Sequence, residues 1–155
     1  MGKKLRGRVQ GRTLDPSNIE GVGTFIYSIS THRYLFLLRN SSKYSGTWGL
    51  AGGKINPNEY LLESLNRELE EELGYDFTNT KVIPIEKFTS DNGYFSYHTF
   101  LIPIDEEFVP ILNYEHRGYC WVALEDHPKP LHPGVWRTIN FTAVVEKIKT
   151  LEKVL

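Results

Sequence analysis

Three glutamates at one spacing form the strongest chemical feature of the sequence. Glu68, Glu71 and Glu72 occupy positions i, i+3 and i+4, which are surface neighbours on an α-helix. Adjacent carboxylates repel, and each such pair costs roughly a few tenths of a kcal/mol. A hard divalent cation would offset that repulsion, and oxygen ligands favour Mg²⁺ or Mn²⁺ over zinc. The alternative is an acidic helix face that is merely solvated.

The glutamates need a helix to hold them, and the sequence predicts one over Pro57–Leu73. Asn56 is a candidate N-cap, and Glu59 is placed to return its carboxylate to the backbone N–H of the cap. Gly74 is a natural C-terminal stop. A leucine occurs at every fourth position along the predicted helix: Leu61, Leu65, Leu69 and Leu73. The glutamate cluster borders this apolar stripe and is expected to line a cleft, whereas Glu63 and Glu70 are expected to face solvent.

The elements around the helix predict an α/β domain. The predicted strands are rich in aromatic and branched residues: Glu20–Ser28, Arg33–Leu38, Lys81–Phe88, Tyr94–Ile104 and Tyr119–Leu124. The stretch His127–Gly134 is predicted as a loop, and helical spacing from Phe141 to Leu151 predicts an amphipathic C-terminal helix. We expect a mixed β-sheet covered by helices.

Length and composition favour one soluble domain. The chain has 155 residues, of which 40% are hydrophobic and 24% charged. No apolar run is long enough to cross a bilayer. Cys120 is the only cysteine, which excludes an intrachain disulfide and a cysteine-built zinc site. A cytoplasmic location is the expectation.

The charge is unevenly distributed. The net charge is -1, yet five cations occur within the first twelve residues: Lys3, Lys4, Arg6, Arg8 and Arg12. We therefore divide the chain into a basic, flexible arm over residues 1–15 and a single domain over residues 16–155. The arm is either a solvated tail or a segment that meets substrate phosphates or RNA.

The spacing around the glutamates is specific. From Gly53 to Tyr75 the sequence reads GKINPNEYLLESLNRELEEELGY, and it resembles the Nudix box. Eight positions match: Gly53, Glu59, Arg67, Glu68, Leu69, Glu71, Glu72 and Gly74. Two positions depart from the usual pattern, because Ala51 stands where proline is common and Tyr75 where an aliphatic residue is usual. The resemblance covers roughly Gly21 to Glu125 and implies the fold of Nudix hydrolases, an α/β/α sandwich.

The resemblance also implies roles for the box residues. Glu68, Glu71 and Glu72 would bind Mg²⁺, or Mn²⁺ in its place, with the Gly52 carbonyl as a further ligand. Arg67 would orient a carboxylate, since its guanidinium can hold one with two hydrogen bonds. Gly53 and Gly74 would be structural residues of the box. Glu59 is either a cap or a support for the ligands.

Nudix hydrolases often use one more acid outside the box, as a metal ligand or general base. The candidates are Glu106, Glu107 and Glu115, and we choose Glu115 because it stands six residues before Trp121, a spacing similar to that in several family members. His116 is an alternative base, since an unperturbed histidine titrates near neutrality. A box glutamate is another.

Substrate contacts are harder to predict. Arg39 and Lys54 are candidates for phosphate contacts. Four aromatic residues could stack on a base, although alternation along a strand would send half of them into the core: Tyr94, Phe95, Tyr97 and Phe100. Of these, Tyr94 is our candidate substrate contact.

Together these residues predict a Mg²⁺-dependent enzyme that hydrolyses the diphosphate linkage of a nucleotide derivative. Candidate substrates are ADP-ribose, a dinucleoside polyphosphate and a modified nucleoside triphosphate. Two alternatives are kept: removal of phosphates from an RNA 5′ end, and a nucleotide-binding regulator without catalysis. The box is intact, which argues against the regulator.

Overall fold

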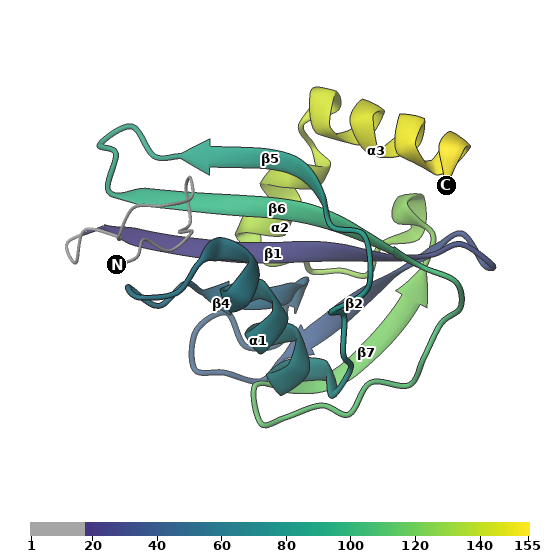
Figure 1. Cartoon of the computed structure of the whole chain (residues 1–155), viewed down its shortest axis with the longest axis horizontal. Coiled ribbons are helices and arrows are strands. Elements are labelled where there is room, and N and C mark those ends of the chain that lie inside the picture. The colour runs from purple at the N-terminus through teal and green to yellow at the C-terminus, as the bar shows by residue number, and fades with distance from the viewer. Residues whose placement is uncertain (1–17) are drawn as a thin grey trace.

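A mixed β-sheet runs through the centre of the domain (Figure 1). The computed structural model describes residues 18–155, so the predicted basic arm lies outside the described residues. The elements are β1 Ile19–Ser28, β2 Arg33–Arg39, β3 Trp48–Gly49, β4 Ala51–Lys54, α1 Leu61–Leu73, β5 Ile83–Thr89, β6 Phe95–Ile104, β7 His116–Val122, a short 3₁₀ helix Leu124–Asp126, α2 Pro133–Ile139 and α3 Thr142–Val154.

The sheet is built around β1. This strand runs parallel to β6 along its whole length, from Ile19 beside Phe95 to Ser28 beside Ile104. It also pairs antiparallel with β2 at the predicted hairpin and with β4 near its start. β5 pairs with β6 and β7 with β2, both antiparallel. The predicted mixed sheet is therefore confirmed.

Helices cover both faces of the sheet. Strand alternation sends Val22 and Ile26 toward α1 and its leucines, whereas Phe25 and Tyr27 contribute to the core under α2 and α3. Figure 1 shows α1 in front of the sheet and α2 and α3 on its other side. This arrangement is the predicted α/β/α sandwich. No helix within residues 18–155 is both long and apolar enough to cross a membrane.

The glutamate helix begins later than predicted. Its N-cap is Tyr60, whose backbone N–H donates to Glu63 at 2.9 Å. The predicted cap at Asn56 is wrong, because residues 56–59 form a turn in which the Glu59 N–H donates to the Asn56 carbonyl at 3.0 Å. Glu63 is exposed as expected, yet its carboxylate caps the helix. Gly74 ends the helix in the left-handed conformation, with φ 65°, as predicted.

Two boundaries in the C-terminal half differ from expectation. β7 begins at His116, three residues before the predicted strand. Part of the predicted loop is helix α2, which begins at Pro133, with His132 as the N-cap. This short helix matters for the site, because its cap residue lines the cleft described below.

Candidate active site

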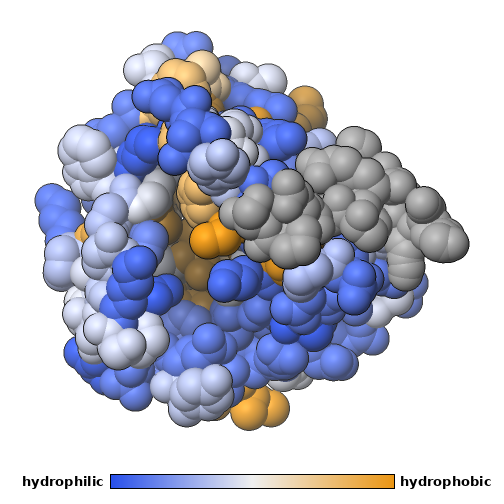
Figure 2. All heavy atoms as spheres, turned by 90° about the vertical axis from the view of Figure 1, so that its left-hand side faces the viewer, coloured by the Kyte–Doolittle hydropathy of each residue, from blue (hydrophilic) through white to orange (hydrophobic). Residues whose placement is uncertain are grey.

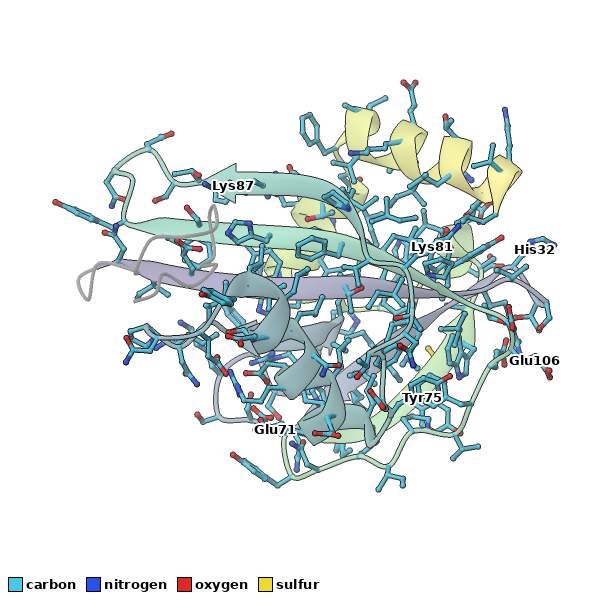
Figure 3. The ribbon with its side chains drawn as sticks, in the orientation of Figure 1. His32, Glu71, Tyr75, Lys81, Lys87 and Glu106 are labelled. Carbon is cyan, nitrogen blue, oxygen red and sulfur yellow. The ribbon has the colours of Figure 1, made fainter. Side chains whose placement is uncertain are left out.

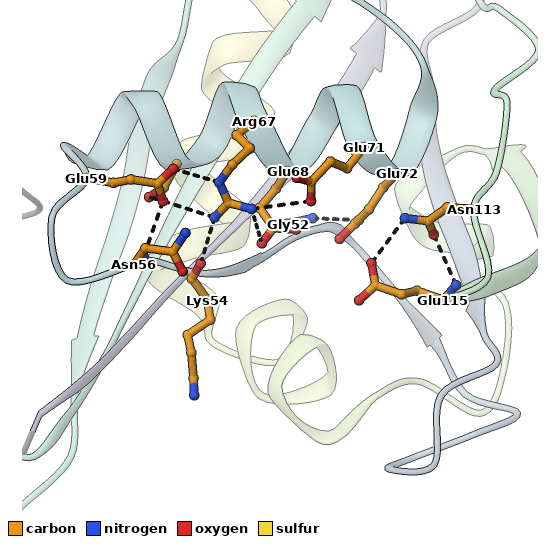
Figure 4. A network of polar contacts seen from close by, with 11 residues as sticks. Gly52, Lys54, Asn56, Glu59, Arg67, Glu68, Glu71, Glu72, Asn113 and Glu115 are labelled. Carbon is orange, nitrogen blue, oxygen red and sulfur yellow. Dashed lines mark hydrogen bonds and ion pairs between the residues drawn. The ribbon is translucent and has the colours of Figure 1, made fainter. Parts of the chain in front are cut away.

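Three carboxylates converge between α1 and the start of β7. Glu68 and Glu72 lie on the buried side of α1, one helical turn apart, and Glu115 approaches them from the loop before β7 (Figure 4). One oxygen from each lies within 4.8 Å of the others. The helical stripe of leucines fixes this orientation, because Leu65, Leu69 and Leu73 are buried on the neighbouring face. Of the three glutamates expected at the edge of the apolar face, Glu68 and Glu72 converge there, and Glu71 does not join them.

A glycine pair lets β4 lie against these carboxylates. The Gly52 N–H donates to Glu72 Oε1 at 3.1 Å. Gly52 has φ 149°, and a Cβ there would lie 2.0 Å from the Val22 carbonyl oxygen. A Cβ on Gly53 would lie 2.5 Å from the carboxylate of Glu68. Neither position has room for a side chain, which explains Gly53 as a structural box residue.

The buried, closely spaced carboxylates of the cluster favour binding of a cation. Burial raises the pKa of Glu72 well above its ordinary value, and the charges of Glu68 and Glu115 raise it further, against the hydrogen bond from Gly52. Burial also raises the pKa of Glu68. Glu72 is only 2% exposed. Buried carboxylates this close together are stable as anions only beside a compensating cation.

Arg67 organises the outer side of the cluster. Its Nε and Nη2 donate to the two oxygens of Glu59 at 2.6 and 3.0 Å, a bidentate pair. Its Nη1 lies 3.3 Å from an oxygen of Glu68 and of Glu71. Burial alone would raise the pKa of Glu59, but hydrogen bonds from Arg67, Ser64 and the Asn56 backbone leave it lowered. Glu59 therefore anchors Arg67, and Arg67 holds Glu68 in place.

Glu71 lies outside the group of converging carboxylates. Its side chain is 51% exposed and pairs with Arg67, and Figure 3 shows it on α1. A metal-binding role for Glu71 stays a prediction. Tyr75, the unusual last box residue, follows the helix, and its ring lies 4.5 Å from that of Phe77 and 4.2 Å from that of Phe108. An aromatic neighbourhood thus replaces the usual aliphatic contact.

Of the three acids considered outside the box, the structure brings only Glu115 to the cluster. The Asn113 amide donates to its carboxylate at 3.2 Å and accepts from its backbone N–H at 3.0 Å. Glu107 pairs with Arg33 at 2.6 Å. Glu106 lies at the same end of the molecule as His32, away from Glu71 (Figure 3).

His116, the alternative base, is buried beside Glu115. Burial, together with the charge of Arg39, lowers its pKa to about 4. Its Nδ1 has no hydrogen-bond partner among residues 18–155. The ring is therefore neutral at physiological pH, and it is not part of the carboxylate group.

A cleft of about 230 Å³ opens beside the glycine pair. Its lining includes Gly52 and Gly53, which contact the carboxylates, and the two predicted phosphate-binding cations, Arg39 and Lys54. The face seen in Figure 2 is hollowed, with apolar residues in its depth and polar residues around it. Gly52, which lines the cleft and donates to Glu72, connects it to the carboxylate cluster.

The aromatic candidates are divided among three environments. Tyr94 is 59% exposed in the turn between β5 and β6 and does not line the cleft. Phe95 and Tyr97 line it. Phe100 is buried in the core under α1. Alternation along β6 therefore operates as expected, but it favours Tyr97 over Tyr94 as a substrate contact.

The sequence did not single out His132, which lines the cleft, or Arg137, which lines an adjoining compartment instead. His132 caps α2 and stands in the stretch predicted as a loop. Arg137 lies one helical turn further along and borders an adjoining apolar compartment. The sequence His132-Pro133-Gly134 contained a usable signal, because proline is favoured at the first position of a helix.

The fold and the carboxylate cluster define a class of protein. A NUDIX domain family model matches residues 18–143, which is most of the chain. The chain belongs to the Nudix hydrolase family.

Particular relatives agree with this assignment. The nucleoside triphosphatase NudI of Escherichia coli O17:K52:H18 is 35% identical in an alignment of 94 positions that covers 54% of this chain and 66% of that protein. The match thus spans just under two thirds of the relative. A MutT protein from Methanosarcina mazei is 27% identical with a TM-score of 0.66, covering 87% of this chain and 99% of that one. A MutT Nudix hydrolase from Burkholderia pseudomallei is 26% identical with a TM-score of 0.64, covering 79% and 95%.

Proposed function

We propose that this protein is a Mg²⁺-dependent pyrophosphohydrolase acting on nucleoside triphosphates, including modified ones. The observation that carries the proposal is the convergence of Glu68, Glu72 and Glu115 within 4.8 Å, beside a cleft that offers Arg39 and Lys54. Among the substrate classes considered, the name of the relative NudI favours a triphosphate.

The residues present fit a hard divalent cation. The donor set is carboxylate oxygen from three residues, which is the chemistry preferred by Mg²⁺ and Mn²⁺. The described part of the chain contributes no histidine or cysteine to this group. We assign Glu68, Glu72 and Glu115 to the cation, with the Gly52 carbonyl as a further ligand and Glu71 as a candidate for an additional one.

The chain's own residues supply the rest of the chemistry. When bound, the cation would acidify a water and neutralise charge on the phosphoryl oxygens. Arg39 and Lys54 hold the outer phosphates in the cleft, while Arg67 keeps Glu68 oriented through its bidentate pair with Glu59. The proton of the attacking water would go to a carboxylate beside the cation, either Glu115 or a box glutamate. The products are a nucleoside monophosphate and pyrophosphate.

The remaining substrate classes stay as outcomes of one experiment. ADP-ribose, a dinucleoside polyphosphate, a 5′-triphosphorylated RNA and the common nucleoside triphosphates are each incubated with the purified protein and Mg²⁺, and the released phosphates are measured. Deletion of residues 1–12 tests the RNA alternative, which predicts a selective loss of activity on RNA.

A cytoplasmic location stays a prediction.

A pair of variants on one helix makes the test specific. Glu72→Gln keeps the size of the side chain and removes its charge, and we expect turnover to fall by more than about a hundredfold, beyond the usual effect of a metal ligand's supporting partner. Glu70→Gln is the matched control, because Glu70 is exposed on the same helix. Equal turnover of the two variants, or no turnover of any substrate, would refute the proposed site.

A further inference from the structure

A second, apolar compartment adjoins the cleft beside the carboxylates. This compartment has a volume of about 310 Å³ and lies beside α2. The two share a wall formed by five residues: Leu50, Phe95, Tyr97, His132 and Val135. A ligand whose phosphates lie near Arg39 and Lys54 can therefore extend its uncharged end into the apolar compartment.

The shared wall presents an aromatic surface to that end of the ligand. The rings of Phe95 and Tyr97 are 6.4 Å apart and within 25° of parallel. Tyr97 lies flat on β1 because two glycines leave room for it. A Cβ on Gly21 would be 3.0 Å from its ring, and one on Gly23 would be 2.1 Å from its hydroxyl. A planar base is the part of a nucleotide suited to such a surface.

His132 presents a hydrogen-bond donor at this wall. Burial, with the charges of Arg39 and Lys43, lowers its pKa, so the ring is neutral at physiological pH. Its Nδ1 accepts from the Gly134 N–H at 3.0 Å. In a neutral imidazole the other nitrogen must then carry the proton. Nε2–H is the donor left for a ligand, since no residue within 18–155 accepts from it.

Arg137 adds donors at the far side of the compartment. Its Nη2 donates to Glu86 at 2.8 Å, and its guanidinium lies 4.4 Å from the centre of the Phe88 ring. These two contacts hold the side chain in place. Its Nε and Nη1 groups make no hydrogen bond within the described residues. Glu86, whose Oε1 accepts from Arg137, does not line the compartment.

The described residues around the apolar compartment include no aspartate, glutamate, asparagine or glutamine. The two hydroxyl groups in the lining are turned away from its open space. That of Tyr97 lies against β1, where a Cβ on Gly23 would be 2.1 Å from it, and Thr138 is 3% exposed and donates to the Gly134 carbonyl at 3.0 Å. A carbonyl oxygen on a base would meet the donors of His132 and Arg137. An amino group at the same position would be buried without a matching acceptor.

We propose that the enzyme selects nucleotides whose base carries a carbonyl group where others carry an amino group: uracil, thymine or hypoxanthine over cytosine or adenine. This inference rests on the proposed function and concerns its base specificity. An amino group of a base that is buried without an acceptor typically lowers the rate for that substrate, relative to the carbonyl analogue, by about fivefold to a hundredfold.

Two pairs of substrates test it directly. UTP and CTP differ at C4 of the pyrimidine and in the proton on the adjacent N3. ITP and ATP differ in the same way at C6 and N1 of the purine, so ring size cancels within each pair. We expect kcat/KM to favour UTP over CTP and ITP over ATP by at least about fivefold. A ratio below that in either pair, or a reversed preference, overturns the inference and leaves the proposed function intact. If none of the four is hydrolysed, the proposed function fails and the inference fails with it.

A variant of Arg137 assigns the preference to the residues named. Arg137→Leu removes the donors and releases the Glu86 carboxylate, so we expect the UTP:CTP ratio to fall to about one or to invert. Arg137→Lys keeps a cationic donor and is expected to retain the preference for UTP. An unchanged ratio in a folded Arg137→Leu protein, confirmed by its circular dichroism, contradicts the assignment to Arg137.

Discussion

Glu72 shows how much of the site depends on one buried charge. Its carboxylate is 2% exposed, accepts the Gly52 N–H at 3.1 Å and has Glu68 and Glu115 as neighbours of like charge. Such a group destabilises the metal-free fold whenever it is ionised. Its presence at the centre of the cluster is typical of a residue placed for function rather than for stability.

This placement predicts how the stability of the metal-free protein depends on pH. Burial raises the pKa of Glu72 in the folded state above its unfolded value. The folded state then binds the proton more tightly, so its contribution is present at low pH and is lost as the pH rises through the folded pKa. With chelator present, thermal denaturation of Glu72→Gln at pH 8 should give a higher Tm than the wild type, and a smaller difference near pH 5. A lower Tm for the variant at pH 8 would contradict this account.

Arg67 is predicted to act through geometry rather than charge alone. It holds Glu59 with two hydrogen bonds and also reaches Glu68 and Glu71. Arg67→Lys keeps the charge but cannot reproduce this fork. We expect activity to fall about tenfold, in the range found when partners of metal ligands are removed, with the half-saturating Mg²⁺ concentration raised. Wild-type kinetics in Arg67→Lys would exclude a positioning role.

The spacing of the box predicted which glutamates lie near the site, but not which of them converge and which is exposed. The helical period placed Glu68, Glu71 and Glu72 on one side, and only their contacts separate the exposed Glu71, paired with Arg67, from the two buried neighbours. Glu115 came from its distance to Trp121 along the sequence. Pro133 indicated a helix start after His132, but not that the fold brings this helix start beside β2 and β4, where His132 lines the cleft.

At the scale of elements, substitution of the two glycines of β4 is predicted to have different effects: at Gly53 on activity and at Gly52 on stability. A Cβ on Gly53 would meet the movable end of Glu68, so Gly53→Ala should displace that carboxylate. We expect activity to fall by about a hundredfold while the free energy of unfolding changes little. Activity and denaturant unfolding of the purified variant check both parts.

Gly52→Ala is predicted to affect folding instead. Its Cβ would lie 2.0 Å from a backbone oxygen of β1, at φ 149°, and the expected cost is about 2 kcal/mol or more. Gly118→Ala is the control in another strand, because its Cβ would meet Leu38 at an ordinary 3.6 Å. If Gly52→Ala and Gly118→Ala unfold at the same denaturant concentration, the close approach of β4 to β1 is wrong.

The elements that were predicted well are those with a long periodic pattern. The leucine stripe predicted α1. The aromatic and branched residues predicted β1, β2, β5 and β6, with boundaries within a few residues of those observed. The start of α1 was misplaced because Asn56-Pro57-Asn58-Glu59 has the residues of a helix N-terminus, while the bidentate pair of Glu59 with Arg67 stabilises a turn. α2 was missed because seven residues are too few for a periodic signal.

At the scale of the whole molecule, the two faces of the sheet are predicted to separate stability from catalysis. Ile148 is a residue of α3 that is 1% exposed, and it packs on the face of the sheet opposite α1. Ile148→Ala should cost about 2–4 kcal/mol and leave kcat unchanged at temperatures where the protein is folded. Leu69→Ala, a comparable deletion beneath the glutamates of α1, should lower both stability and kcat. Equal effects of the two on kcat would show that the faces are not independent.

The central claim is that carboxylates from two separate elements bind one divalent cation. Titration of the metal-free protein with Mn²⁺, followed by electron paramagnetic resonance, measures this binding without any assumption about the substrate. The account predicts that Glu115→Gln and Glu72→Gln each weaken Mn²⁺ binding by about tenfold or more, whereas the exposed Glu70→Gln binds as the wild type does. Unchanged Mn²⁺ affinity in both Glu115→Gln and Glu72→Gln would contradict it.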